Sequence, residues 1–459
     1  MSKAHIFNNN ILRAYDIRGE IGKTLNNIDA ERLGNIFVSS FNKKNIKVIV
    51  CRDGRVSSPE LAESLKKGLY ESGADVIDIG LGPSPMLYYA ANYLESDGAI
   101  MVTGSHNPPS HNGFKIMKGK VPFFGDDILD IGVRGREGNW SYNKGTRLDY
   151  SIQDKYINIL LKSLKLDKIN KNIKVAWDPG NGAAGDIIEK LVNLLPGEHI
   201  LINSNIDGLF PSHHPDPTDP KNLEEIISLV KDKKLDIGLA FDGDGDRLGV
   251  VSSRGNIVWG DQILALLSKE VLKDMPKSPI IADVKASQNL FDEIEKLGGV
   301  PVMWKTGHSF IKSKMKEISS PLAGEMSGHI FFADRYLGYD DGIYAALRVL
   351  ELIEDSSTLD NFLDNLPQKF STQEIKIECS DDKKFKVIEE LSYILDRNNI
   401  IVNKVDGLRI QREDGWWLLR ASNTQAVLVA RIEAESKNSL NKLQKELNFY
   451  LNKFNLSLI

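Results

Sequence analysis

The stretch Ile46-Lys47-Val48-Ile49-Val50-Cys51-Arg52-Asp53-Gly54 is a short apolar run that ends at an aspartate, and its pattern recurs twice along the chain. Residues 173–180 and 279–283 repeat it, and each of the three runs precedes a helical stretch and a further strand. The copies lie more than 100 residues apart, a spacing that excludes solenoid repeats of roughly 20 to 50 residues and favours duplicated domains. The sequence therefore predicts an α/β fold with three similar α/β domains, each a mixed sheet sandwiched by helices.

The C-terminal part of the chain follows a different pattern. We expect a strand over residues 373–379, a helix over 383–398, a hairpin through 409–430 and a closing helix from Ser436 onward, which together predict an α+β domain. A length of 459 residues would suggest about three domains of roughly 150 residues, but four smaller ones fit this pattern better. The predicted domains are residues 1–147, 148–254, 255–367 and 368–459.

One hydroxyl nucleophile follows directly on an apolar strand. Residues 99–102 are apolar and lead into Thr103-Gly104-Ser105-His106-Asn107-Pro108-Pro109, where the two prolines prevent an ordinary helical continuation. Ser105 is therefore expected at the C-terminal end of a strand, which is where open α/β sheets bind ligands. Because a free serine hydroxyl is a weak nucleophile, the rest of the chain must activate it.

A second apolar strand ends in Asp242-Gly243-Asp244-Gly245-Asp246-Arg247. Three carboxylates this close raise one another's pKa values unless a hard cation such as Mg²⁺ binds them, so Asp242, Asp244 and Asp246 are candidate ligands. A calcium loop of the EF-hand type starting at Asp242 is excluded, because its sixth and twelfth positions hold Arg247 and Ser253 in place of Gly and Glu. An acidic surface turn and a phosphatase with Asp242 as its nucleophile remain the alternatives, but the second leaves Ser105 unexplained.

Two further polar loops follow apolar stretches. Glu325, Ser327 and His329 alternate between glycines and suit recognition of vicinal sugar hydroxyls, with a plain polar turn as the alternative. The stretch Arg420-Ala421-Ser422-Asn423-Thr424 offers a guanidinium, two hydroxyls and an amide, which suit a phosphate dianion. Taken alone this second loop would be a weak signal, since Ser, Asn and Thr are ordinary turn residues.

Together these stretches resemble the α-D-phosphohexomutase superfamily, and within it the bacterial phosphomannomutase/phosphoglucomutase branch, over nearly the whole chain. Residues 14–19 resemble the family's N-terminal phosphate-contacting segment, and the four loops above resemble its phosphoserine, metal, sugar and phosphate loops in the same order. The resemblance implies four domains around a central active-site cleft. It also implies a phosphoryl group on Ser105, with one of its oxygens completing the Mg²⁺ shell.

The implied reaction shifts phosphate reversibly between positions 1 and 6 of mannose and glucose phosphates, through a hexose 1,6-bisphosphate that turns around in the site. The implied catalytic residues are Ser105, His106, Lys115, Arg247 and His308. Among them His308 is a candidate general acid/base, and His106 is an orienting or phosphate-contacting group. The implied substrate-binding residues are Tyr15, Arg18, Lys285, Glu325, Ser327, His329, Arg420, Ser422, Asn423 and Thr424.

Three alternatives to this reaction stay open at this stage. They are a phosphoglucosamine mutase, a non-catalytic sugar-phosphate sensor that has kept the fold, and a hydrolase that releases phosphate from Ser105. The sensor is disfavoured because Ser105, Lys115 and the three aspartates are all present. A hydrolase would need a path for water, whereas the family closes its last domain over the substrate.

The composition argues against nucleic-acid binding, a disulfide or metal framework of cysteines, and membrane association. A net charge of −5 offers no broad basic surface for nucleic acid, and Trp416-Trp417 is expected in core or hinge packing. The two cysteines, Cys51 and Cys379, match no metal or disulfide framework, which agrees with a reducing cytoplasm. Neither a signal core nor a run of about 18 apolar residues is present, so no membrane association is expected. We expect a cytoplasmic monomer, with a dimer as the alternative.

Overall fold

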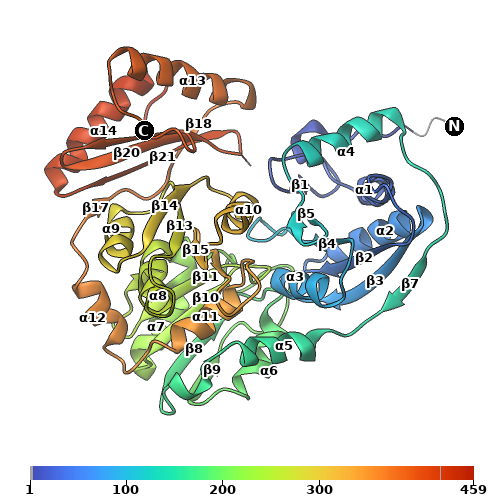
Figure 1. Ribbon diagram of the computed structural model, residues 1–459, viewed down its shortest axis with the longest axis horizontal. Coiled ribbons are helices and arrows are strands. Elements are labelled where there is room, and N and C mark those ends of the chain that lie inside the picture. Colours follow the sequence, from blue (N-terminus) through green and yellow to red (C-terminus); the bar gives the residue numbers. More distant parts are fainter. Residues whose placement is uncertain (1–3, 424, 459) are drawn as a thin grey trace.

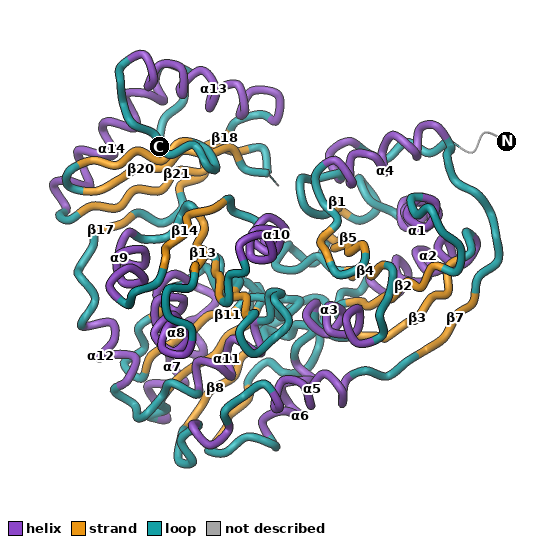
Figure 2. The backbone as a smooth tube through the Cα atoms, viewed as in Figure 1, coloured by secondary structure: helices purple, strands orange, loops and turns teal. Residues whose placement is uncertain are grey.

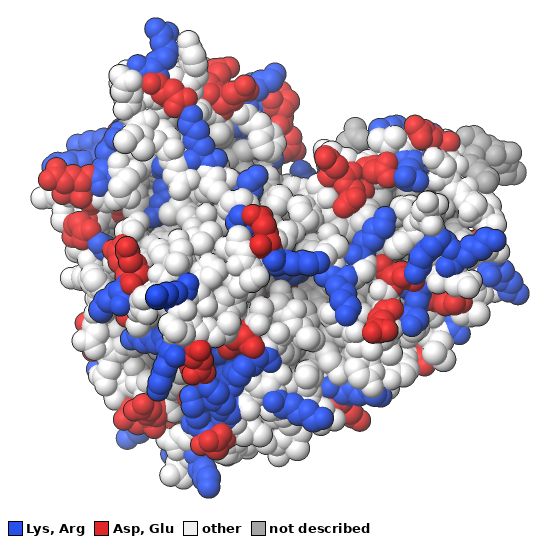
Figure 3. Space-filling model, in the orientation of Figure 1, with Lys and Arg blue, Asp and Glu red and all other residues white. Residues whose placement is uncertain are grey.

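The computed structural model describes residues 4–423 and 425–458 and contains four β-sheets flanked by helices (Figure 1). The sheets follow one another along the chain, from the blue N-terminal part to the red C-terminal part in Figure 1. Among the described residues, no helix is both long enough and apolar enough to cross a membrane. Figure 3 shows a notched outline, in which the notch separates the C-terminal lobe from the N-terminal lobe.

The first sheet has the strand order β1-β5-β4-β2-β3-β7, with β6 paired to β5. Its strands are β1 (Ile17–Glu20), β2 (Ile46–Arg52), β3 (Ala74–Leu81), β4 (Gly98–Val102), β5 (His111–Lys118), β6 (Val121–Pro122) and β7 (Thr146–Asp149). The accompanying helices are η1 (Asn9–Ile11), α1 (Asn27–Ser39), α2 (Ser58–Glu71), α3 (Ser84–Tyr93) and α4 (Asp126–Glu137).

Alternating side chains of β2 show why this sheet needs helices on both faces. Val48 and Val50 belong to the core that α1, α2 and α4 share, whereas Ile49 and Cys51 belong to the core that contains α3. Successive side chains of a strand point to opposite faces, so an uninterrupted apolar strand has to be covered on both. Figure 2 shows the resulting arrangement of helices around strands.

The second sheet has the order β12-β11-β10-β8-β9 and the third β14-β13-β15-β16. The elements of the second are α5 (Gln153–Lys162), η2 (Leu166–Lys168), β8 (Lys174–Asp178), α6 (Gly185–Val192), β9 (Glu198–Leu201), η3 (Pro220–Leu223), α7 (Glu224–Lys233), β10 (Ile237–Phe241), β11 (Leu248–Ser252) and β12 (Ile257–Val258). Those of the third are α8 (Gly260–Asp274), β13 (Pro279–Asp283), α9 (Gln288–Lys296), β14 (Val300–Trp304), α10 (His308–Ile318), β15 (Leu322–Gly324), β16 (Ile330–Phe332), α11 (Gly342–Leu350) and α12 (Thr358–Asp364).

These three sheets share one topology, as the sequence repeats predict. In each, the strand of the repeated motif (β2, β8 or β13) pairs in parallel with two neighbours. The second of those neighbours (β4, β10 or β15) then pairs antiparallel with the next strand of the chain. The loop between these last two strands therefore occupies an equivalent place in each domain.

The fourth sheet is antiparallel, with the order β17-β21-β20-β19 and β18 paired to β21. Its elements are β17 (Phe370–Ser371), β18 (Ile375–Glu378), α13 (Asp381–Arg397), β19 (Leu408–Arg412), β20 (Gly415–Ala421), β21 (Val427–Ala434) and α14 (Lys437–Asn452). Trp417 packs in the core of this domain, whereas Trp416 packs with Val284 of the third domain. The prediction of core or hinge packing for the two tryptophans is confirmed. The predicted domain boundaries stay predictions, and the first of them, residue 147, lies within β7.

Candidate active site

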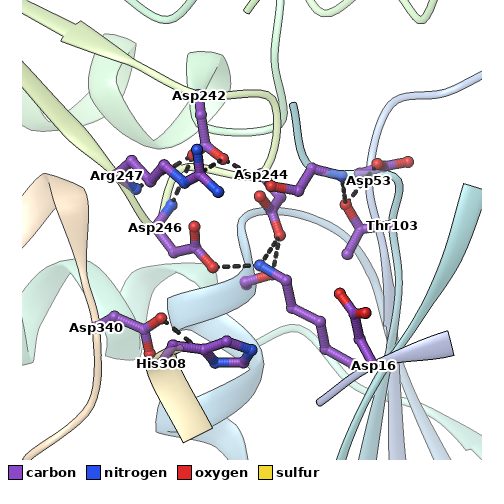
Figure 4. Close-up of polar contacts among 12 residues, drawn as sticks. Asp16, Asp53, Thr103, Asp242, Asp244, Asp246, Arg247, His308 and Asp340 are labelled. Carbon is purple, nitrogen blue, oxygen red and sulfur yellow. Dashed lines mark hydrogen bonds and ion pairs between the residues drawn. The ribbon is translucent and has the colours of Figure 1, made fainter. Parts of the chain in front are cut away.

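Three equivalent loops of the first three domains converge at one place, and Figure 4 shows Thr103 of the first loop close to Asp242, Asp244 and Asp246 of the second. They are the loop from β4 to β5 with Ser105, the loop from β10 to β11 with the three aspartates, and the loop from β15 to β16 with Glu325. A β-bridge between Arg247 and His329 joins the second loop to the third. The repeated topology thus explains how segments far apart in the sequence meet.

Ser105 lies buried and in an unusual backbone conformation. Its φ of 47° is in the left-handed region, which a residue with a Cβ adopts only when its surroundings hold it there. The N–H of Ser105 donates a hydrogen bond to Thr103 Oγ1 at 2.8 Å. The side-chain Oγ of Ser105 donates a hydrogen bond to Asp242 Oδ2 at 2.8 Å and lies 3.2 Å from His106 Nδ1. The hydroxyl is therefore aimed at the aspartate loop of another domain.

Asp53 and Arg55, which sequence reasoning did not select as site residues, hold this loop in shape. Asp53 accepts hydrogen bonds from Thr103 Oγ1 at 2.7 Å and from the N–H of Gly104 at 3.1 Å. The guanidinium of Arg55, with an exposed fraction of 0%, donates to the carbonyl oxygens of Ser105, Asn107, Pro108 and His111. Asp53 ends the first repeated strand, so its position was visible in the sequence, although its partners were not.

The carboxylates of Asp242, Asp244 and Asp246 are fully buried, and each offers an oxygen within 4.8 Å of the others. Lys115 Nζ donates to Asp244 Oδ2 at 2.6 Å and also bonds Asp246 Oδ2. One oxygen of Asp244 and one of Asp246 are buried without a hydrogen-bond partner. Buried, unsatisfied carboxylate oxygens are what a hard divalent cation requires, so this loop fits a metal.

The charges in this cluster shift its ionisation strongly. Burial, and then the neighbouring charges of Asp244 and Asp246, raise the pKa of Asp242 well above its usual range. Burial acts in the same direction on Asp244, but the Lys115 ammonium outweighs it and lowers the pKa of that carboxyl. Burial and the positive charges of Arg247 and Arg18 lower the pKa of His106 well below its usual value, which keeps this histidine neutral.

Two histidines stack beside the carboxylate cluster. The rings of His308 and His329 lie 5.9 Å apart at an angle of 17°. Arg247 Nε donates to His329 Nε2 at 3.0 Å, and His329 Nδ1 lies 3.1 Å from Asp340 Oδ2. Asp340 could not be identified from the sequence, because it lies eleven residues beyond His329 and has no motif of its own; Figure 4 shows it facing His308.

Two of the predicted substrate residues, Lys285 and Arg420, lie where the third and fourth domains meet. Lys285 Nζ donates to Glu374 Oε1 at 2.6 Å, and Arg420 Nε donates to Asp406 Oδ2 at 2.9 Å. Asp406 in turn accepts a hydrogen bond from the N–H of Thr306, two residues before His308. Ser422 is buried and Asn423 is half-buried, and Thr424 lies outside the described residues.

Residues from the first domain and the sugar loop complete the set. Tyr15 places its ring edge-on to His308, with the centroids 5.7 Å apart. Arg18 Nη1 donates to the carbonyl of Gly104 at 2.5 Å and thus braces the serine loop. Glu325 is buried and accepts a hydrogen bond from the N–H of Gly307 at 2.6 Å, while Ser327 is half-buried. Tyr15 and His308 therefore connect the loops of Ser105 and the three aspartates with Lys285 and Arg420 at the fourth domain.

Comparisons with known proteins agree with this architecture. Residues 9–130, 154–255 and 259–370 match the phosphoglucomutase/phosphomannomutase alpha/beta/alpha domains I, II and III, and residues 374–448 match the C-terminal domain of that family. A phosphomannomutase/phosphoglucomutase of Pseudomonas syringae pv. tomato is 44% identical over 446 residues, which cover 96% of this chain and 95% of that protein.

A phosphoglucomutase of Neisseria meningitidis serogroup A is 41% identical over 441 residues, or 95% of each chain. The crystal structure of a phosphoglucomutase/phosphomannomutase family protein from Burkholderia thailandensis, 39% identical, has a TM-score of 0.90 and covers 98% of both chains. Since the matches span all four domains and the relatives align over nearly their whole length, this chain belongs to the phosphoglucomutase/phosphomannomutase family.

Proposed function

We propose that this enzyme interconverts mannose 1-phosphate with mannose 6-phosphate, and glucose 1-phosphate with glucose 6-phosphate. The phosphoryl group is carried on Ser105, and a hexose 1,6-bisphosphate is the intermediate. The observation that supports this most is the contact of Ser105 Oγ with Asp242 Oδ2 at 2.8 Å, inside a buried cluster of carboxylates and cations. The names of the relatives, which include both sugars, support the same reaction.

Asp242, Asp244 and Asp246 are the proposed ligands of one Mg²⁺ ion, together with an oxygen on Ser105. When bound there, Mg²⁺ supplies neutralisation of negative charge on the phosphoryl oxygens. Lys115, which bonds Asp244, and Arg247, whose Nε lies 3.9 Å from Asp242 Oδ2, add fixed positive charge beside the three aspartates, and buried cations of this kind stabilise a transferring phosphoryl group. The proposed role of the protein is thus mainly to position groups and balance charge.

The first transfer breaks the bond from phosphorus to the Ser105 oxygen and forms one to a sugar oxygen, so the sugar hydroxyl must lose its proton. The second transfer, from the bisphosphate, breaks the bond from phosphorus to the other sugar oxygen, re-forms the bond to Ser105 and returns a proton to the sugar oxygen. His329 is the better acceptor of the two stacked histidines. Its Nε2 lone pair accepts a hydrogen bond from Arg247 Nε at 3.0 Å, so it takes the sugar proton only once the Arg247 guanidinium turns from it to the transferring phosphoryl group, and its Nδ1 lies 3.1 Å from Asp340 Oδ2. A carboxylate at that distance helps to orient the imidazole ring.

The bisphosphate must then turn around, so the site needs a second phosphate anchor that accepts either end of the sugar. Lys285, Arg420, Ser422, Asn423 and Thr424 are the proposed anchor, and Glu325 and Ser327 are the proposed contacts to the sugar hydroxyls. Both cations of the anchor are paired with carboxylates, Lys285 with Glu374 and Arg420 with Asp406, so an incoming phosphate replaces or shares these partners.

Such a site discriminates poorly between mannose and glucose phosphates. The two sugars differ only in the C2 hydroxyl, and the site has to bind each of them in two orientations. We therefore expect dual specificity. The test is kcat/KM for mannose 1-phosphate and glucose 1-phosphate, measured with Mg²⁺ and a trace of glucose 1,6-bisphosphate. Values within about a hundredfold of each other support the proposal. If neither sugar phosphate is converted, the proposal is wrong, and the remaining candidates are a phosphoglucosamine mutase and a non-catalytic sugar-phosphate sensor.

We also propose a cytoplasmic location and hexose phosphates as the ligands, with the domain boundaries predicted above. The location is supported by Cys51 and Cys379, which are both free and buried, as a reducing compartment permits. The monomer remains the expected state.

A further inference from the structure

The ammonium group of Lys312 is held on three sides by groups of the candidate active site. Lys312 lies in α10, one turn after His308, and 10% of its side chain is exposed. Its Nζ lies 3.0 Å from His308 Nδ1 and donates to Asp340 Oδ1 at 2.8 Å. The ring of Tyr88, from α3 of the first domain, covers it at 4.4 Å. None of the loop motifs in the sequence includes this lysine.

This contact determines where the proton of His308 sits. An ammonium group can only donate hydrogen bonds, so a His308 Nδ1 that bonds it must present its lone pair. A neutral imidazole with a lone pair on Nδ1 carries its hydrogen on Nε2. The charged imidazolium is disfavoured too, because burial, and then the charge of Lys312, lower the pKa of His308 well below its usual value.

The other ring nitrogen of His308 is left without a protein partner. His308 Nε2 is buried and makes no hydrogen bond among the described residues. Tyr15, one of the predicted substrate-binding residues, places its ring edge-on to the His308 ring, with the centroids 5.7 Å apart. A buried N–H without an acceptor costs free energy until a ligand supplies one.

We propose that Lys312 is a positioning residue that fixes His308 as its neutral Nε2–H tautomer, so that His308 offers a hydrogen-bond donor to an anionic sugar phosphate. A ring in this state cannot accept a proton at Nε2, and its Nδ1 is blocked by the ammonium group. The inference rests on the proposed function and gives His308 a task other than the general acid/base role predicted from the sequence. Proton transfer then falls to His329.

The structure also shows which group would act on His308 Nδ1 if the ammonium group of Lys312 were removed. Asp340 Oδ2 lies 3.7 Å from His308 Nδ1, close enough to attract a proton on that nitrogen once the ammonium group is gone. In Lys312→Met, the proton of His308 should therefore move to Nδ1 and leave a bare lone pair on Nε2. The group facing the substrate would change from a donor to an acceptor, which repels a phosphate oxygen.

The test is ¹⁵N NMR of the phosphorylated, Mg²⁺-loaded enzyme with ¹⁵N-labelled histidine, where His308→Asn identifies the signals of His308. Wild type and Lys312→Arg should show a protonated Nε2 and an unprotonated Nδ1, because arginine also only donates. Lys312→Met should show the reverse pattern or a charged ring. The matched control is Lys314→Met in the same helix, because Lys314 contacts Trp304 and Glu317 instead, and it should leave the His308 signals unchanged.

A binding measurement accompanies the spectra. Glucose 6-phosphate should bind Lys312→Met about 10- to 100-fold more weakly, as expected when one hydrogen bond to a charged group is lost, and Lys312→Arg should recover most of that loss. A wild-type His308 protonated on Nδ1, or a tautomer that is the same in wild type and Lys312→Met, would overturn the inference. The spectra do not depend on turnover, so an enzyme that isomerises neither sugar but shows the expected tautomers would contradict only the proposed function.

Discussion

Ser105 Oγ donates a hydrogen bond to Asp242 Oδ2 at 2.8 Å, although 137 positions separate the two residues and they belong to different sheets. The contact is short because the two loops meet backbone to backbone. A Cβ placed on Gly243 would lie only 2.4 Å from the carbonyl oxygen of Ser105. The reaction centre therefore depends on how closely the first domain docks on the second.

The first prediction follows from this close approach. In Gly243→Ala, the added methyl group has to push the serine loop away from the aspartate loop, because the obstacle is backbone and not the end of a flexible side chain. A displacement of about 1 Å can cost about 100-fold in rate, so we expect kcat to fall by that order. Gly119→Ala is the control: its φ of 60° makes the substitution cost some stability, but nothing lies within 4 Å of its Cβ, so the folded variant should keep the wild-type kcat. A kcat of Gly243→Ala close to that of wild type would contradict the close docking.

The second prediction concerns the metal. Burial and the charges of its neighbours raise the pKa of Asp242, which means that its ionised form is unfavourable in the folded, metal-free protein. Asp242→Asn should therefore raise the melting temperature without metal, yet lose most of the increase that Mg²⁺ gives the wild type. Activity should fall by roughly 100-fold or more.

Thermal unfolding with and without Mg²⁺ measures this effect, and Asp130→Asn, which removes an exposed carboxylate of α4, is the matched control. Chelation should abolish wild-type activity and added Mg²⁺ should restore it. An equal Mg²⁺-induced shift in wild type and Asp242→Asn would show that the aspartate loop is not the metal site.

The third prediction concerns pH and stability. Burial raises the pKa of Asp341 to about 6, against the hydrogen bonds that it accepts from Tyr156, Tyr336 and the N–H of Tyr344. The folded protein thus binds this proton more tightly than the unfolded chain, whose carboxyl has an ordinary value of 3.8. The resulting stabilisation is complete below about pH 4 and is lost as the pH rises through about 6, and it amounts to about 3 kcal/mol at most.

Asp341→Asn should remove this pH dependence. The free energy of unfolding of the wild type, measured by denaturant titration between pH 4 and 7, should fall relative to that of Asp341→Asn as the pH rises. Parallel curves for the two proteins would mean that Asp341 keeps an ordinary pKa in the folded state.

The fourth prediction concerns the C-terminal domain. Its contacts with the third domain include Arg409, which donates to the carbonyl oxygens of Val284 and Ala286, while residues 366–372 connect the two domains. We expect this domain to rotate about that connection and close over the substrate, which excludes water from the phosphoryl group. Saturating glucose 1,6-bisphosphate should reduce the radius of gyration in X-ray scattering. An unchanged scattering profile would count against closure.

The sequence predicts the fold class well because apolar strands ending at Asp53, Asp178 and Asp283 mark the same step of three repeated domains. The matching loops then have to occupy equivalent places. The prediction of three similar α/β domains with mixed sheets is confirmed, and the structure adds the strand pairing that the three share. The α+β nature of the last domain is confirmed in the same way by its antiparallel sheet and its two long helices.

The sequence shows less of what supports the site. Arg55 satisfies four carbonyl groups of the serine loop, and Lys312 bridges His308 and Asp340, but neither residue lies in a loop motif. Their roles depend on which backbone atoms and side chains the fold brings within hydrogen-bonding distance. Periodicity and motif spacing carry no such information, so these residues become visible only in three dimensions.

The measurement that tests the central claim most directly is the isomerisation of mannose 1-phosphate and glucose 1-phosphate by wild type and by Ser105→Ala, with Mg²⁺ and a trace of glucose 1,6-bisphosphate. The account predicts that the wild type forms both 6-phosphates and that Ser105→Ala, though folded, loses activity by roughly a thousandfold or more. Release of inorganic phosphate without isomerisation, or full activity in Ser105→Ala, would contradict it.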